Sequence, residues 1–134
     1  MKSYTYTRAL QAAIIGIAVT GQATLARADI KDYEFQLVDK TITKGDVIIA
    51  VRLVHKPDGK PVPNAVIFAT RLDMAPDGMQ EMATKVTPMP GTEPGTYRFK
   101  ANLTMTGGWQ LSLGAKVQGE TGTVENKLVL KATP

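Results

Sequence analysis

The stretch that decides the fold reads Thr96-Tyr97-Arg98-Phe99-Lys100-Ala101-Asn102-Leu103-Thr104. Its apolar side chains occupy every second position, at Tyr97, Phe99, Ala101 and Leu103. Because successive side chains of a β-strand point to opposite faces, a period of two predicts a strand with one buried face. An amphipathic helix would repeat its apolar positions every three or four residues. The stretch therefore predicts a strand that packs on a core.

The same pattern recurs along the chain. It predicts further strands over Tyr33–Asp39, Asp46–Val54, Ala65–Leu72, Trp109–Val117 and Val124–Ala132, with a brief pairing over Thr84–Thr87. Turn residues such as Pro57-Asp58-Gly59 and Gly107-Gly108 separate these runs. About seven short strands in roughly a hundred residues predict an all-β fold, a single immunoglobulin-like antiparallel β-sandwich.

The beginning of the chain has the layout of a signal peptide. Lys2 and Arg8 come first, and a mostly apolar run from Ala9 to Leu25 follows. The tripeptide Ala26-Arg27-Ala28 then supplies the small-x-small pattern of a cleavage site.

This layout predicts an exported protein. The uninterrupted apolar core, Ala12–Val19, is shorter than the roughly 20 residues that a spanning helix needs. We therefore expect a signal peptide over residues 1–28, cleavage after Ala28, and one periplasmic domain over residues 29–134. The alternative is an N-terminal anchor that stays uncleaved.

The charge balance argues against polyanionic partners. Removing Lys2, Arg8 and Arg27 from the 16 basic residues leaves 13, against 12 acidic residues. Since nucleic-acid binding needs a basic face, we expect no nucleic-acid partner. The remaining length suits one domain, which we expect to be a monomer. With no cysteine in the chain, sheet packing alone has to hold this domain together.

Residues for catalysis are scarce. Beyond residue 28 the chain has one serine, Ser112, and one histidine, His55. Ser112 stands between Leu111 and Leu113 on a predicted strand, and no Gly-x-Ser-x-Gly elbow presents it. A zinc site needs several His or Cys ligands. We expect that the protein is not an enzyme.

Three acidic residues, Asp73, Asp77 and Glu81, recur at intervals of four. A calcium loop places its ligands at every second position and closes with a glutamate at position twelve, so this spacing does not match. We interpret the two aspartates as turn formers around Pro76 and Gly78. Their charge would also favour a cation bound nearby.

Four methionines, Met74, Met79, Met82 and Met89, fall within 16 residues that we expect to form a loop between two strands. Thioethers are soft and neutral ligands, so converging methionines bind Cu(I) or Ag(I) in preference to hard cations. His55 ends the second predicted strand, and it would complete a Met/His site if it lies near the loop.

Other interpretations of these residues stay open. The methionines also suit an apolar docking patch, or a cap over one end of the core. His55 also fits an exposed residue beside a turn. Trp109 fits the sandwich core. In the alternative interpretation, its ring lies over a bound soft cation.

The motifs resemble those of the FixH/YtkA-like exported β-sandwich domains. The resemblance covers about Gly45–Ala132 and rests on four segments, namely the turn at Asp58–Ala65, the Met-Ala-Pro-x-x-Met run at Met74–Met79, Gly95-Thr96-Tyr97, and Gly107–Leu111. These are turn glycines and aromatic core anchors, which specify a fold more closely than an activity.

The resemblance implies a role in metal homeostasis. The family occurs in envelope proteins associated with copper handling, heavy-metal efflux and cytochrome oxidase assembly. Its loop methionines map onto Met74, Met79, Met82 and Met89. FixH proper is held in the membrane by a helix, whereas the cleavable leader here favours a soluble carrier with no stable membrane insertion.

The sequence thus supports two hypotheses. The first is a periplasmic soft-metal binding protein that holds Cu(I) or Ag(I) through Met74, Met79, Met82, Met89 and His55, and serves an efflux or oxidase-assembly partner. The second is a non-metal module in which the same loop docks on an envelope membrane complex.

Overall fold

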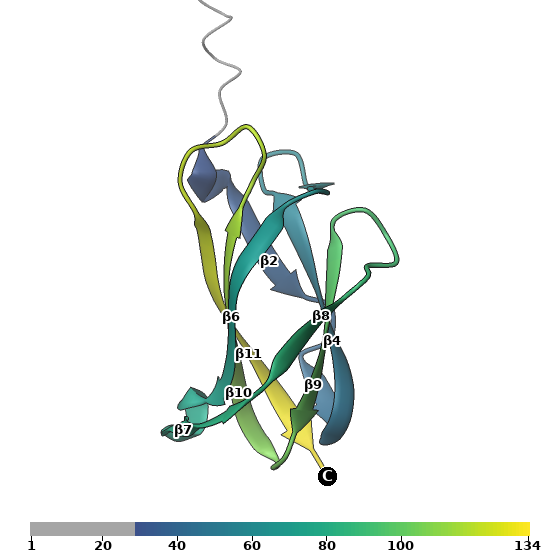
Figure 1. Ribbon diagram of the computed structural model, residues 1–134, viewed down its shortest axis with the longest axis vertical. Helices are drawn as coiled ribbons and strands as arrows, with labels where there is room; N and C mark the ends of the chain where they lie inside the picture. The colour runs from purple at the N-terminus through teal and green to yellow at the C-terminus, as the bar shows by residue number, and fades with distance from the viewer. Residues whose placement is uncertain (1–28) are drawn as a thin grey trace, which may run out of the picture.

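The computed structural model describes residues 29–134, which form two β-sheets packed face to face (Figure 1). The predicted all-β sandwich is confirmed, although this part of the chain has ten strands rather than about seven. The predicted signal peptide over residues 1–28, with cleavage after Ala28, lies outside the described residues. Within residues 29–134, no helix is long and apolar enough to cross a membrane.

Each sheet is a ladder of short strands. The first has the order β3-β11-β10-β6-β7, with bounds Thr41–Thr43, Val124–Thr133, Gly107–Lys116, Val66–Met74 and Met79–Thr84. The second has the order β2-β4-β9-β8, with bounds Tyr33–Leu37, Gly45–His55, Thr96–Leu103 and Val86–Met89, and the short β5 (Lys60–Pro61) pairs with β4. Two 3₁₀ turns, η3 (Ile30–Asp32) and η4 (Ala75–Asp77), complete the described elements.

The core forms where the inner faces of the two sheets meet. It contains alternating residues that the sequence pattern picked out, and the largest fully buried side chains are Trp109, Phe35, Phe99, Ile49, Leu53, Leu72, Met74, Leu103, Leu111, Leu130 and Val51. Trp109 is therefore a core residue, as expected. Its indole Nε1–H donates to the main-chain oxygen of Met105 at 3.0 Å, which satisfies the buried polar atom.

The methionine segment is more ordered than the predicted loop. Met74 ends β6, the turn η4 reverses the chain, and β7 returns beside β6 as a hairpin. The chain then crosses to the second sheet as β8, the edge strand beside β9. The loop prediction was wrong because Met82 and Thr84 alternate with exposed residues and pack inward, a weak period of two that the turn residues obscured.

The shortest strands escaped prediction. After β2 the chain leaves the second sheet, and β3 joins the first sheet as a parallel partner of β11. The main-chain N–H of Lys131 donates to the oxygen of Lys40 at 2.8 Å just where this change of sheet occurs. Strands of two or three residues, such as β5 and β3, contain too few residues to display a period.

The packing makes a direct prediction about stability. Leu111 is fully buried on β10, whereas Val129 on β11 is 54% exposed. Leu111→Ala should lower the free energy of unfolding by about 2–5 kcal/mol, because it removes buried methyl groups and leaves a cavity. Val129→Ala should change it by about 0.5 kcal/mol or less. Denaturant unfolding measures both, and equal losses would contradict the assignment of the core.

Candidate functional site at the methionine end

Met74 and Met79 face each other across the β6–β7 hairpin. Their Cα atoms are register partners, after an irregularity in the pairing that follows Asp73. Cross-strand partners share one face of a sheet, and Met74 belongs to the core, so both side chains lie on the inner face. Met82 also packs against the core from β7. Three of the four loop methionines therefore gather at one end of the sandwich, near β7 and η4 at the lower left of Figure 1.

A fourth methionine, remote in sequence, lies at the same end. Met105 is 40% exposed in the turn between β9 and β10, and the buried indole of Trp109 holds its main-chain oxygen. Two residues farther on, a Cβ added to Gly107 would lie 3.0 Å from the terminal methyl carbon of Met74. We call Met74, Met79, Met82 and Met105 the methionine end. The predicted ligand group did not include Met105, because this residue is remote from the other methionines in the sequence. Its position at the end of a predicted strand was the one sign that it could lie at an end of the sandwich.

A carboxylate covers this end of the sandwich. Asp77 Oδ2 accepts a hydrogen bond from the main-chain N–H of Gly108 at 3.1 Å, which ties η4 to β10. Gly107 has φ +132°, and a side chain there would collide with the Asp77 carboxylate. The glycine pair therefore leaves the space that Asp77 and the Met74 methyl occupy.

The other acidic residues have different surroundings. Asp73 is buried, with Oδ2 at 2.7 Å from Arg71 Nε and Oδ1 accepting from the main-chain N–H of Ala75 at 3.0 Å. Arg71 also donates to the main-chain oxygen of Gln80, so this ion pair fastens the hairpin. Glu81 is exposed. Among residues 29–134, no three His, Asp or Glu side chains gather as a cluster that could hold a metal ion.

Met89 does not join the methionine end. It lies on β8 in the second sheet, where its register partner is Arg98. The preceding residue, Pro88, is paired with Phe99, which faces the core. Because neighbouring residues of a strand face opposite ways, Met89 lies on the outer face of its sheet.

His55 also lies far from the methionine end. It is the last residue of β4, whose first residue, Gly45, pairs with Leu103 just before the Met105 turn. The 11 residues of β4, at about 3.3 Å per residue, separate the two ends by roughly 30 Å. His55 and the loop methionines therefore do not form one cluster.

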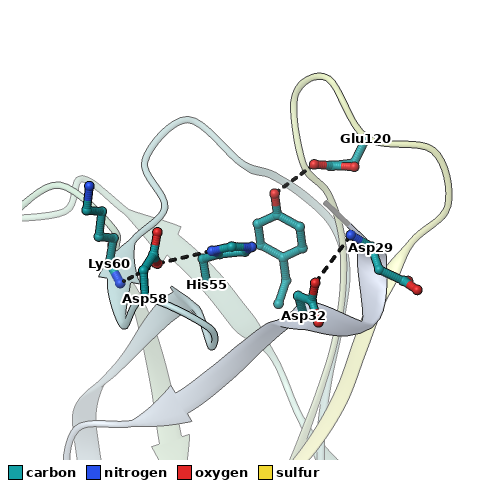
Figure 2. Close-up of polar contacts among 7 residues, drawn as sticks. Asp29, Asp32, His55, Asp58, Lys60 and Glu120 are labelled. Atoms are coloured by element: carbon teal, nitrogen blue, oxygen red, sulfur yellow. Dashed lines mark hydrogen bonds and ion pairs between the residues drawn. The ribbon is translucent and has the colours of Figure 1, made fainter. Parts of the chain in front are cut away.

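At its own end, His55 belongs to a small polar group (Figure 2). Its Nδ1 lies 3.0 Å from Asp58 Oδ1, and that oxygen also accepts the main-chain N–H of Lys60 at 3.0 Å. Its Nε2 is buried and has no hydrogen-bond partner in the described part of the chain. The neutral tautomer that donates from Nδ1 suits both facts, because it leaves Nε2 as a lone pair that needs no acceptor.

The neighbouring Tyr33 ring lies 5.1 Å from the His55 ring, centroid to centroid. Its hydroxyl donates to Glu120 Oε2 at 2.8 Å. Burial, together with this bond to Glu120, raises the pKa of Tyr33 to about 12. The phenol therefore stays neutral at physiological pH and works as a fixed donor.

Ser112 and His55 do not meet either. Ser112 lies on β10 in the first sheet, where Arg71 and Lys127 are its register partners. His55 ends β4 in the second sheet. Within residues 29–134, Ser112 and His55 therefore form no serine–histidine pair for acyl transfer.

The turn at Asp58 predicts a pH dependence of stability. The main-chain N–H of Lys60 and then the His55 side chain lower the pKa of the Asp58 carboxyl. The ionised form thus stabilises the fold at pH values above the pKa of an unfolded aspartate, and this contribution is lost as pH falls through the folded pKa. Asp58→Asn should therefore be less stable than the wild type at neutral pH.

Denaturant unfolding at several pH values checks this expectation, with the exposed Asp39→Asn as control. The gap between wild type and Asp58→Asn should narrow as pH falls below the ordinary range of aspartate pKa values. A gap that is independent of pH would show that the Asp58 charge does not contribute.

A family model described as YtkA-like matches residues 27–114. No curated protein matches the chain in sequence. Among solved structures, the ZirS C-terminal domain has a TM-score of 0.45 and 9% sequence identity, over 96% of this chain and 87% of that chain, a similarity from which nothing about function follows. The family match spans well over half of the chain and confirms the resemblance drawn from its motifs, so the chain belongs to the YtkA-like family.

Proposed function

We propose that this YtkA-like β-sandwich is an exported, non-enzymatic binding protein that holds Cu(I) or Ag(I) at its methionine end. The observation that carries the proposal is the pairing of Met74 with Met79 on one inner face, with Met82 beside them on β7. Thioethers that approach from two strands and a turn suit a low-coordinate soft cation. Met105, in the adjacent exposed turn, is the fourth donor in this proposal.

The surroundings of these thioethers suit a monovalent soft ion. Arg71, the cation three residues before Met74, is already engaged with Asp73 and with Gln80. The Asp77 carboxylate lies over Gly107, next to the Met74 methyl, where its charge favours a cation. Neutral ligands release no proton on binding, and a chain without cysteine cannot lose the site to disulfide formation.

Loading of this site requires a local opening. Met74 is 0% exposed, so its sulfur becomes accessible only when η4 moves away from β10. The hydrogen bond from Gly108 to Asp77 is the polar contact that such a movement breaks. One exposed hydrogen bond contributes little to stability, so a short 3₁₀ turn at the end of a hairpin is a suitable place for this opening.

The exported carrier role extends this proposal to the cell envelope. The signal-peptide layout of residues 1–28 supports a periplasmic location. The role in copper handling that the motif resemblance implies would suit an efflux or oxidase-assembly partner. A carrier has to release its metal, and thioether ligands exchange readily by substitution. Oxidation to methionine sulfoxide would disable the site.

A competition titration with Cu(I) tests the proposal. The purified protein competes with a chromogenic Cu(I) chelator under anaerobic conditions, and native mass spectrometry gives the stoichiometry. We expect one bound Cu(I), and we expect Met79→Ile/Met82→Ile to weaken binding by about tenfold or more, which corresponds to ~1.4 kcal/mol.

Two matched controls come from the residues that lie elsewhere. Met89→Ile makes the same chemical change on the outer face of the second sheet, and His55→Gln alters the opposite end. Both should bind Cu(I) like the wild type. Absence of binding by the wild type, or an equal loss in Met89→Ile, would refute the assignment to the methionine end.

A further inference from the structure

The outer face of the first sheet carries a groove of about 430 Å³. It runs along β10 between β6 and β11 and is lined mainly by apolar surface. The residues that line it include Phe68, Arg71, Ser112, Gly114, Glu125 and Lys127. The groove lies on the opposite side of the sheet from the core.

A β-bulge aims Phe68 into this groove. Gly114 pairs with Ala69, whereas the next residue, Ala115, pairs with Ile67, so Phe68 is the extra residue. Bulges redirect side chains, and the Phe68 ring is accordingly 56% exposed on the outer face. Its tip would lie 3.3 Å from a Cβ added to Gly114, so the glycine forms a floor against which the ring lies. An exposed aromatic ring over a hollow is typical of a contact surface.

The charged residues around the groove follow a simple register. At the level of Ser112, the neighbouring strands present Arg71 on β6 and Lys127 on β11. One outward position farther, at Gly114, the neighbour on β11 is Glu125. On the outer face, each strand thus carries one residue at the level of Ser112 and a different one at the level of Gly114. These are Arg71 and the bulged Phe68 on β6, Ser112 and Gly114 on β10, and Lys127 and Glu125 on β11.

We propose that this groove is the contact surface for a second copy of the chain in a two-fold symmetric dimer. A two-fold axis that lies in the interface and crosses the strands at the level of Leu113 places each strand over its own copy, running the opposite way. Lys127 of one copy then meets Glu125 of the other, and the symmetry makes this ion pair twice.

The same axis accounts for the remaining residues of the groove. The Phe68 ring of one copy lies over the Arg71 side chain of the other, an aromatic and guanidinium pair. Arg71 is held in place by Asp73 and Gln80, so it presents a fixed surface. At the centre, Ser112 of one copy faces the Phe68 ring that lies over Gly114 of the other, and its small side chain leaves room for that ring.

The charge pattern also favours this axis over one that runs parallel to the strands. A two-fold axis parallel to the strands would place β6 of one copy over β11 of the other at equal levels. Arg71 would then face Lys127, and like charges in contact oppose association. The dimer differs from the monomer expected from the sequence, and it does not depend on metal binding at the methionine end.

Analytical ultracentrifugation of the purified protein over a range of concentrations tests the dimer. We expect a monomer–dimer equilibrium for the wild type, and a shift to monomer for Phe68→Ser, which removes the exposed ring without touching the core. Ile48→Ser, an equally drastic change at a 47% exposed position on the second sheet, should leave the equilibrium unchanged. A wild-type protein that stays monomeric at every concentration would overturn the proposal and leave the groove to an unrelated partner.

Charge exchange tests the orientation. Glu125→Lys should favour the monomer, because it places two lysines in contact in each symmetric pair. Glu125→Lys/Lys127→Glu should restore the dimer, since the exchanged charges again meet their opposites. Lys127→Glu alone should also favour the monomer, because it brings two carboxylates together, whereas an axis parallel to the strands would set the new carboxylate against Arg71 and strengthen the dimer. Glu93→Lys, in an exposed turn, is the matched control for net charge. A dimer that survives the single change, or a double variant that fails to recover it, would refute the proposed axis.

Discussion

Burial of Trp109 at the start of β10 is the constraint on which the rest of the structure depends. The ring fills the core where the two sheets meet, and its indole N–H fixes the Met105 turn. The glycine pair just before it leaves room for Asp77, and so for the close approach of η4 to β10. The geometry of the methionine end is therefore a consequence of core packing at one end of one strand.

β10 also determines what the outer face can do. Its inner side supplies Trp109, Leu111, Leu113 and Ala115 to the core, whereas its outer side presents small residues, Ser112 and Gly114. A central strand with large residues inside and small ones outside leaves a hollow between its neighbours. β10 thus shapes both the methionine end and the groove on the outer face of the first sheet. Because the two surfaces are separate, a partner in the groove leaves the methionine end free to bind metal.

Much of the fold could be predicted from the sequence because alternation reports directly on which face is buried. The runs around Phe99 and Leu111 and the second strand around Ile49 are core strands as expected. The hairpin at Met74 was missed because prolines and glycines in the segment favour a loop locally, while pairing with β6 provides the stabilisation. Local propensity gives no information about such tertiary pairing.

The candidate site could be predicted only in part, for a related reason. Nearness in sequence brought Met89 into the predicted group, yet the chain crosses to the other sheet before reaching it. His55 ends β4 and Met105 follows β9, and only the register of these two strands shows which end of the sandwich each residue occupies. Asp73 and Asp77 were interpreted as turn formers, and each does hold main-chain groups at the hairpin.

The most direct measurement of the central claim is X-ray absorption at the copper edge of the Cu(I)-loaded protein. If the methionine end is the site, the first shell consists of sulfur scatterers, and the spectrum of His55→Gln is identical to that of the wild type. Imidazole scattering that disappears in His55→Gln, or a shell of nitrogen and oxygen alone, would contradict the account, because thioethers from β6 and β7 would then not be the ligands.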